Sequence, residues 1–335
     1  MLARFRRHER TGVAIRRKGW HIAFDLHLRV EQLNCRENVI VNWVIEPVDP
    51  DRPDFVGRVS GFEIAQGVSV ELAARIEAAM DHYAVLVLPG QQITDEQQYA
   101  FSQHFGPMEQ ATGDFARREE RRLSMNINDI SNLDQHGRVR ARDDAVRLFG
   151  LGNMLWHSDS SFKATPAKFS LLSARVIPDA GGNTEFADMR AAWDALDSST
   201  QAQCRDLVCW HSQIFSRGLL GFDDWDDAYK KHNEPVPQRL VRRHPNTGRL
   251  SLYLSAHAGD ITGWPRPEAR MLLRDLNEHA TQRTFVYAHR WQPRDLVIWD
   301  NRVLMHRARA YDASQARDMR RTTVADRCPT LEQPV

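Results

Sequence analysis

The chain has 335 residues, of which 42% are hydrophobic and 27% charged, and its formal net charge is +1. This composition is typical of a soluble globular protein with an ample core, and the balanced charge gives no reason to expect a nucleic acid as partner. No apolar run approaches the ~18 residues of a transmembrane helix, so we expect no membrane partner either. The four cysteines form no C-x-x-C pair, which favours free thiols and a reducing, cytoplasmic location.

The first 45 residues are predicted to be a basic extension. Residues 1–30 carry eight Lys or Arg against two acidic residues, without the apolar stretch or cleavage site of a secretory signal. Two interpretations stay open: a disordered or poorly packed arm, or a translation start that is wrongly set. Proline and aspartate at 46–54 break regular structure, so we place the main domain at 46–330.

Capping and turn signals predict the first elements of that domain. Ser69 can cap a helix whose apolar residues share one face, and residues 84–88 are typical of a buried strand. Thr94 and Gln97 form a capping box that opens a second helix. Residues 109–150 have weak periodicity, and we expect a long loop there, which is either an active-site lid or disordered.

Strands and helices alternate irregularly through the second half of the chain. Residues 216–240 are expected to form a loop. The predicted strands are 169–177, 183–187, 284–291 and 296–299, and the predicted helices begin near Asp188, Ser198 (through Leu207) and Pro265. Many strands bounded by turn signals, with helices inserted between them, predict a mainly β fold of the sandwich or jelly-roll type.

One short motif stands out, Trp156 to Phe162, because it contains His157 and Asp159 two residues apart. On a strand, residues i and i+2 point to the same face, so an imidazole and a carboxylate would lie side by side. They would form two of the three ligands of a 2-His-1-carboxylate iron(II) site. About two His-x-Asp/Glu triplets are expected by chance in this composition, and the other, at His232 to Glu234, is interpreted as loop.

The C-terminal part offers a third ligand and two arginines. His306 follows a strand that is expected to be buried, and it can enter the same site. Arg317 and Arg321 would share one face of a strand, with Arg320 on the other. Two inward guanidiniums are costly unless anions meet them, and arginine matches carboxylates well. Two bound carboxylates are one interpretation, and a solvated basic hairpin is the other.

Together these residues resemble the taurine-dioxygenase-like family of Fe(II)/2-oxoglutarate dioxygenases. The resemblance covers roughly residues 46–326, and it is closest to the branch that acts on 2,4-dichlorophenoxyacetate. The motifs that carry it are His157-x-Asp159 with distal His306 and Arg317, Asp129 to Asn132, Gly181 to Ala192, Trp299 to Asn301, and Met305 to Arg307.

The resemblance implies a double-stranded β-helix, also called a jelly roll, with the metal at its open end. His157, Asp159 and His306 would then bind Fe(II), and 2-oxoglutarate and O₂ would be cosubstrates. Arg317 and Thr184 would hold the far carboxylate of 2-oxoglutarate, while Arg321 would bind the substrate carboxylate and Asn153 would line the substrate pocket. Ascorbate is the expected activator in vitro, and we expect a homo-oligomer.

The implied reaction hydroxylates the carbon between the ether oxygen and the carboxylate of an aryloxyalkanoate. The product collapses to a phenol and glyoxylate, and 2-oxoglutarate gives succinate and CO₂. Two alternatives stay open. Arg321 could hold a sulfonate or alkyl sulfate nearly as well as a carboxylate, or the chain could be a jelly roll that binds a metal without catalysis.

Overall fold

The structure is a computed structural model that describes residues 43–111 and 121–334. Nearly all of the predicted extension (1–45) lies outside these residues, and so does Cys35. Strand β1 (Val44–Pro47) begins two residues before the predicted start of the domain. Within the described ranges, no helix combines the length and the apolar character that a membrane crossing needs.

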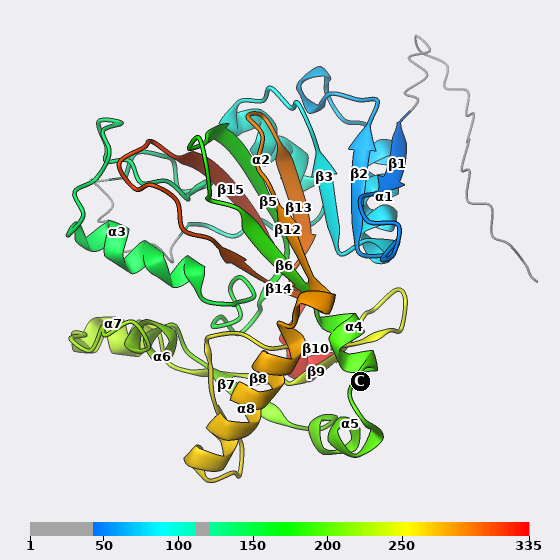
Figure 1. The fold of residues 1–335 in the computed structure, drawn as a ribbon, viewed down its shortest axis with the longest axis vertical. Helices are drawn as coiled ribbons and strands as arrows, with labels where there is room; N and C mark the ends of the chain where they lie inside the picture. Colours follow the sequence, from blue (N-terminus) through cyan, green and yellow to red (C-terminus); the bar gives the residue numbers. More distant parts are fainter. Residues whose placement is uncertain (1–42, 112–120, 335) are drawn as a thin grey trace, which may run out of the picture. The chain divides into compact units, whose positions relative to one another are not determined.

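A seven-stranded sheet is the largest element of the fold (Figure 1). Its strands are antiparallel except for the parallel pair β2 and β3. In spatial order they are β1, β2 (Val56–Ser60), β3 (Val85–Leu88), β13 (Leu296–Asp300), β5 (Ala167–Val176), β15 (Asp318–Ala325) and β4 (Asn128–Asp129).

A smaller sheet packs against one face of the large one and completes the jelly roll. Its antiparallel strands are, in order, β12 (Val286–His289), β6 (Thr184–Asp188) and β14 (Leu304–Ala308). Apolar side chains from both sheets meet in one core cluster, which includes Val297, Met319 and Phe186. The predicted double-stranded β-helix is therefore confirmed, and the motifs singled out in the sequence lie on or beside its strands.

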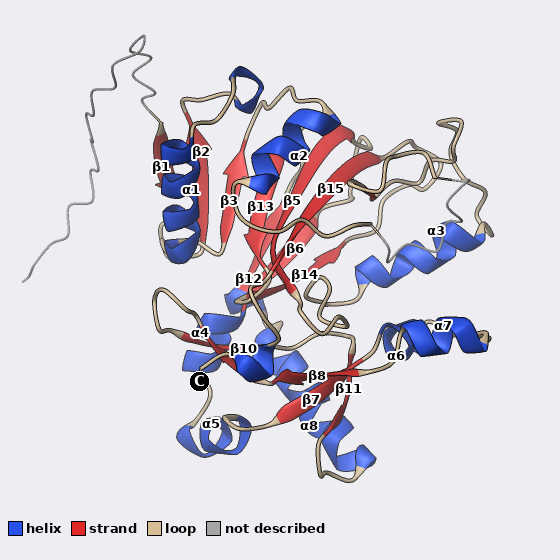
Figure 2. Cartoon of the chain, turned by 180° about the vertical axis from the view of Figure 1, so that it is seen from behind, coloured by secondary structure: helices blue, strands red, loops and turns tan. Residues whose placement is uncertain are grey.

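Two helices cover the other face of the large sheet (Figure 2). Helix α1 (Val70–His82) begins where the Ser69 hydroxyl accepts a hydrogen bond from the Leu72 amide, 3.2 Å away. Helix α2 (Asp95–Gln103) begins with the predicted capping box of Thr94 and Gln97. Both capping predictions are confirmed, because a cap depends only on residues within one turn of the helix.

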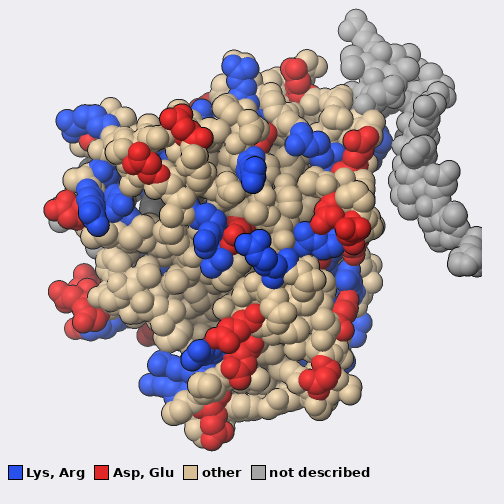
Figure 3. All heavy atoms as spheres, viewed as in Figure 1, with Lys and Arg blue, Asp and Glu red and all other residues tan. Residues whose placement is uncertain are grey.

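The remaining elements form a helical and β insertion, part of which packs around another apolar cluster. Its strands are β7 (Val208–His211), β8 (Val236–Arg239), β9 (Val241–Arg243), β10 (Leu250–Leu252) and β11 (Ala258–Ile261). The helices of the second half are α3 (Ala145–Gly150), α4 (Met189–Asp194), α5 (Ser198–Cys204), α6 (Gln213–Gly218), α7 (Asp227–His232) and α8 (Arg266–Ala280). On the face seen in Figure 3, basic and acidic side chains are interspersed, in keeping with the net charge of +1.

Three local predictions were wrong. The presumed loop at 216–240 contains α7 and β8, because Asp226 accepts a hydrogen bond from the Tyr229 amide and caps a helix there. His232 is therefore the last residue of a helix. The presumed loop at 109–150 contains β4 and α3, although residues 112–120 lie outside the described ranges. Helix α5 ends at Cys204, before the predicted Leu207.

One buried histidine makes the stability of this fold sensitive to acid. His211 is fully buried, with its Nδ1 3.0 Å from the Ser161 hydroxyl and its ring stacked on Tyr253 at 5.8 Å. Burial lowers the pKa of His211 from 6.5 to about 3. Below pH ~6.5 the unfolded chain therefore binds a proton that the folded chain refuses, so the free energy of unfolding falls as the pH drops toward about 3.

We expect a His211→Asn variant to lose part of this pH dependence. Denaturant unfolding between pH 7.5 and pH 4 would show a smaller decrease in the free energy of unfolding for the variant than for the parent protein. Exposed His136 offers a matched control, and His136→Asn should keep the parent slope. Identical slopes for the parent and His211→Asn would contradict the assignment.

Candidate active site

Two histidines from distant parts of the chain are joined by their backbones. The His157 amide donates to the His306 carbonyl at 3.0 Å, and the His306 amide donates to the His157 carbonyl at 2.8 Å. Such a reciprocal antiparallel pair puts the two side chains directly opposite each other. Their ring centroids are 4.2 Å apart. His306 lies within strand β14, not after a strand as predicted, and His157 forms only an isolated bridge.

Asp159 joins the two histidines from a turn rather than from a regular strand. One carboxylate oxygen lies 3.7 Å from His157 Nε2 and the other lies 3.7 Å from His306 Nε2. The next residue, Ser160, has a φ of +54°, which turns the chain away from the strand direction. The side chains of His157 and Asp159 do lie together, as the same-face argument predicted, but a turn rather than a strand brings them there.

A network of polar side chains orients the Asp159 carboxylate. The Ser170 hydroxyl donates to Asp159 Oδ2 at 2.7 Å, and the Asn301 side-chain amide donates to Ser170 at 3.0 Å. Asn301 Oδ1 accepts from the Asp159 amide at 3.1 Å and from the Trp299 indole at 3.0 Å. Sequence reasoning singled out the triplet Trp299 to Asn301 only as a family motif, and it missed Ser170.

The charges of this cluster are those of a site for a cation. Burial alone raises the pKa of Asp159, but the Arg321 guanidinium and the two imidazoles hold it below the usual range. Burial lowers the pKa of His157, against the attraction of Asp159. Burial and the neighbouring His157 lower the pKa of His306 well below its usual value. Two neutral imidazoles and one carboxylate therefore face one another at neutral pH.

The donor set fits a divalent transition metal. The ligand atoms of His157, Asp159 and His306 all lie within 4.8 Å of one another. His157 Nδ1 lies 2.7 Å from the Leu155 carbonyl, so Nδ1 carries the hydrogen and the Nε2 lone pair points into the cluster. Two histidines and one carboxylate with open positions are the ligand set of non-haem iron(II) oxygenases.

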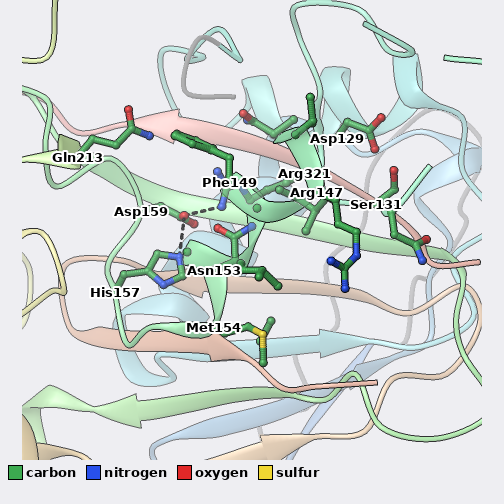
Figure 4. Close-up of a pocket in the computed structure, with 18 of the residues that line it drawn as sticks. Asp129, Ser131, Arg147, Phe149, Asn153, Met154, His157, Asp159, Gln213 and Arg321 are labelled. Atoms are coloured by element: carbon green, nitrogen blue, oxygen red, sulfur yellow. Dashed lines mark hydrogen bonds and ion pairs between the residues drawn. The ribbon is translucent and has the colours of Figure 1, made fainter. Parts of the chain in front are cut away.

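Arg321 enters the cluster directly, which sequence reasoning did not foresee. Its Nη1 donates to Asp159 Oδ1, and its Nε is buried without a hydrogen-bond partner. Arg320 points to the other face of β15, as predicted, where it pairs with Asp95 at 2.8 Å. One of the two carboxylates expected to meet the inward arginines is thus Asp159, which belongs to the protein itself (Figure 4).

Arg317 has no carboxylate partner among the residues that the structure describes. It is 5% exposed, and its Nη1 donates to the Ile130 carbonyl at 3.2 Å while its Nε has no partner. The Asn132 side chain accepts from the Arg317 amide at 2.8 Å, which fixes the start of β15. Burial lowers the pKa of Arg317, yet at neutral pH the guanidinium stays protonated. A buried, uncompensated cation of this kind calls for an anionic ligand.

Thr184 and Asn153 lie in different surroundings. Thr184 is buried on β6 opposite Ala308, a residue that lines the pocket. Its hydroxyl oxygen accepts from the Trp291 indole at 3.0 Å, so the hydroxyl hydrogen remains available to another acceptor. Asn153 lines the pocket itself, a few residues before His157 (Figure 4).

A pocket of about 370 Å³ opens onto the cluster. Its lining brings together His157, Asp159, Arg317, Arg321 and Asn153. Phe162, the last residue of the motif that begins at Trp156, also lines the pocket. Sequence reasoning missed several further lining residues, which come from the insertion and from the segment expected to be a loop: Phe149, Gln213, Arg217 and His257. No periodic or capping signal marks these side chains as part of a site, because only tertiary packing brings them to it.

Comparison with known proteins gives concordant results. Residues 45–323 match the family described as taurine catabolism dioxygenase TauD, TfdA family. A Cupriavidus pinatubonensis protein named alpha-ketoglutarate-dependent 2,4-dichlorophenoxyacetate dioxygenase is 43% identical over 278 residues, which are 83% of this chain and 97% of that protein. A Sphingobium herbicidovorans (S)-phenoxypropionate/alpha-ketoglutarate-dioxygenase is 40% identical over 75% of this chain and 85% of that protein.

A solved structure is also similar. The crystal structure of AAD-2 in complex with Mn(II) and N-oxalylglycine is 56% identical, with a TM-score of 0.83, and the match covers 86% of this chain and 99% of that one. The family match, at residues 45–323, spans the jelly roll and includes His157, Asp159 and His306.

Proposed function

The chain belongs to the taurine catabolism dioxygenase TauD, TfdA family, and we propose that it is a 2-oxoglutarate-dependent dioxygenase whose substrate is an aryloxyalkanoate. The enzyme uses Fe(II), 2-oxoglutarate and O₂. The observation that carries the proposal is the pocket, in which buried arginines lie beside the His157, Asp159 and His306 cluster. The names of relatives that are 43% and 40% identical support an aryloxyalkanoate substrate.

In this proposal, His157, Asp159 and His306 bind Fe(II) through their converging ligand atoms. When bound, iron supplies the activation of O₂ that couples decarboxylation of 2-oxoglutarate to hydroxylation of the substrate. Ser170 and Asn301 keep the Asp159 carboxylate oriented toward the metal through their hydrogen bonds. Such partners of a metal ligand typically change metal affinity or activity 10–100-fold when they are removed.

Arg317 and Thr184 hold the far carboxylate of 2-oxoglutarate. Support comes from the Arg317 guanidinium, which has no carboxylate partner among the described residues and whose Nε makes no hydrogen bond. The Thr184 hydroxyl also supports it, because its oxygen accepts from the Trp291 indole and its hydrogen can therefore be donated. A bidentate guanidinium contact is suited to a terminal carboxylate. The buried setting excludes water, which strengthens this contact.

Arg321 binds the carboxylate of the acid substrate while it keeps its contact to Asp159, and Asn153 lines the space for the rest of the molecule. This arrangement ties the substrate carboxylate to the metal site through one side chain. It aims the carbon between carboxylate and ether oxygen at the metal, where a misplacement of about 1 Å can cost ~100-fold in rate. Hydroxylation at that carbon releases a phenol and glyoxylate.

A panel of acids would test this function against its alternative, the oxidation of a sulfonate or alkyl sulfate. We expect phenoxyacetate and both phenoxypropionate enantiomers to stimulate release of succinate from 2-oxoglutarate in the presence of Fe(II) and ascorbate. Taurine and an alkyl sulfate should stimulate succinate release at least tenfold less. The reason is that the relatives at 40% identity and above are named for carboxylic acid substrates. Preference for the sulfur acids would overturn the proposal, and no stimulation by any acid would favour a jelly roll that binds a metal without catalysis.

Two further expectations go with this function. A reducing, cytoplasmic location is supported by Cys204, Cys209 and Cys328, which are all free thiols. The homo-oligomer stays a prediction of the sequence, and light scattering would measure it.

A further inference from the structure

A further arginine, which is buried, reaches the pocket from the insertion. Arg217 lies on α6 and is only 7% exposed, and it lines the same pocket as His157, Asp159 and Arg321. Its guanidinium carbon lies over the Phe149 ring, 4.4 Å from the centroid. Burial lowers the pKa of Arg217 to about 10, so the side chain still carries its charge at neutral pH.

Arg217 has no carboxylate partner within the described ranges. Within those ranges, the one hydrogen bond of its guanidinium is a long one of 3.4 Å from Nη1 to the Ser216 hydroxyl, and its Nε is buried with no partner. Most buried arginines of this fold are different: Arg190 pairs with Asp188 at 2.9 Å, and Arg302 pairs with Asp300 at 2.7 Å. A buried cation without a counter-charge destabilises a protein unless a ligand meets it.

The backbone at Gly152 lies so close to the Arg217 guanidinium that a side chain at position 152 would not fit. A Cβ atom at Gly152 would lie 2.1 Å from Arg217 Nη1 and 2.2 Å from its Cζ. Gly152 stands between α3 and the metal-binding motif, and it is buried. A glycine here lets the guanidinium reach the wall of the pocket, with Phe149 on one side of it.

Arg217 and Arg321 lie at different parts of the metal cluster. Arg321 contacts Asp159 directly. Arg217 instead lies against the Phe149 ring. Burial lowers the pKa of His157 and the pKa of His257 most. Both arginines lower the pKa of His157 further, and Arg217 also lowers the pKa of His257. His257 packs edge-on against Phe162 at 4.8 Å, so an aromatic part of the pocket lies on the Arg217 side. Phe149 and Phe162 thus offer aromatic surface for the ring of an aryloxyalkanoate in the part of the pocket near Arg217.

The charges beside the metal cluster also favour a second anion. Iron and the arginines 217, 317 and 321 would carry five positive charges, and Asp159 with the 2-oxoglutarate dianion would carry three negative ones. The other charged side chains of the lining do not reverse this excess, because Glu109 pairs with Lys163, Asp129 pairs with Arg122, and Arg147 and Arg309 are cations. A substrate with two anionic groups therefore compensates more of the positive charge than a substrate with one carboxylate.

We propose that Arg217 is a specificity residue that binds a second anionic group at the ring end of the substrate. The preferred acid is therefore an aryloxyalkanoate whose ring carries a carboxylate or a similar anion. This inference rests on the proposed function, which places the first carboxylate of the substrate at Arg321. It adds that the ring end of the substrate carries a second anionic group.

Binding of matched acids tests the proposal without turnover. The full chain is loaded with Fe(II) and 2-oxoglutarate in the absence of O₂, and calorimetry measures the affinity for 3- and 4-carboxyphenoxyacetate and for the two corresponding carboxamides. We expect at least one diacid to bind about tenfold or more tightly than its neutral carboxamide, since hydrogen bonds between charged groups are the strong ones. Arg217→Met should abolish this preference and leave the affinity for the carboxamides within about threefold.

Two further variants separate the role of the guanidinium from a role in folding. Arg217→Lys keeps the charge without the planar fork and should retain part of the preference. Gly152→Ala keeps Arg217 but displaces its guanidinium, and it should reduce the preference as well. The matched control is Arg274→Met on the surface of α8, where the side chain is 68% exposed and pairs with Glu278. Arg274→Met should keep the preference of the parent protein for the diacid over the carboxamide.

The outcomes distinguish this proposal from the function on which it rests. The proposal is overturned if the parent protein prefers neither diacid, or if Arg217→Met weakens diacid and carboxamide equally. In the second case Arg217 would hold the first carboxylate, or would only support the fold. If a diacid binds preferentially but yields no glyoxylate when O₂ is admitted, the aryloxyalkanoate reaction fails while the Arg217 site stands.

Discussion

Replacing Arg321 by alanine is expected to weaken binding of the acid substrate by about 10–100-fold and to leave binding of 2-oxoglutarate within a few-fold. The physical reason is that the substrate carboxylate loses its guanidinium partner, whereas Arg317 and Thr184 are untouched. Arg317→Ala should instead weaken binding of 2-oxoglutarate and leave binding of the acid substrate within a few-fold. Anaerobic binding of each compound to the Fe(II)-loaded protein measures both effects separately.

A nearby arginine serves as the control for this pair of variants. Arg320 lies between the two on the same strand, but its side chain pairs with Asp95 and Asp318 on the opposite face of β15. Arg320→Ala should change neither affinity by more than about threefold. Equal loss of substrate and 2-oxoglutarate binding in Arg321→Ala would show that the two arginines do not have separate roles.

Replacing Asp159 by alanine is expected to have the largest effect on activity. It removes the only carboxylate of the metal cluster and leaves Arg321 without its partner, so the buried positive charge of the site rises. Removing a residue that only orients a metal ligand typically costs 10–100-fold, and the loss of the ligand itself should exceed that. Metal content after dialysis and succinate release with an acid substrate measure the two consequences.

A comparison with Ser170→Ala tests whether the loss of metal and activity comes from the Asp159 carboxylate itself. Ser170→Ala removes one hydrogen bond to the carboxylate but keeps the carboxylate, so its metal affinity should lie between those of Asp159→Ala and the parent protein. If Asp159→Ala retained metal and turnover, the cluster of His157, Asp159 and His306 would not be the iron site.

The elements predicted well are those specified by neighbouring residues. The caps at Ser69 and Thr94 act within one helical turn, and the strands of the jelly roll are short apolar runs between turns. The helix at Asp227–His232 was missed although Asp226 caps it, because its residues are mostly polar and none of them is buried.

The site required information that no local stretch contains. His157 and His306 meet through reciprocal backbone hydrogen bonds between distant segments. The sequence pattern offered His306 only as a candidate third ligand, and the family resemblance then connected the two histidines. The contact of Arg321 with Asp159 and the burial of Arg217 depend on tertiary packing. Arginine is usually exposed, so sequence alone gave no reason to single out Arg217 among the others.

The stoichiometry of products from a phenoxyacetate tests the central claim most directly. With Fe(II), 2-oxoglutarate and O₂ supplied, phenol, glyoxylate and succinate should form in equal amounts, and all three should disappear when iron is withheld or when Asp159 is replaced by alanine. Succinate that forms without matching phenol and glyoxylate, or phenol that forms without iron, would contradict the account.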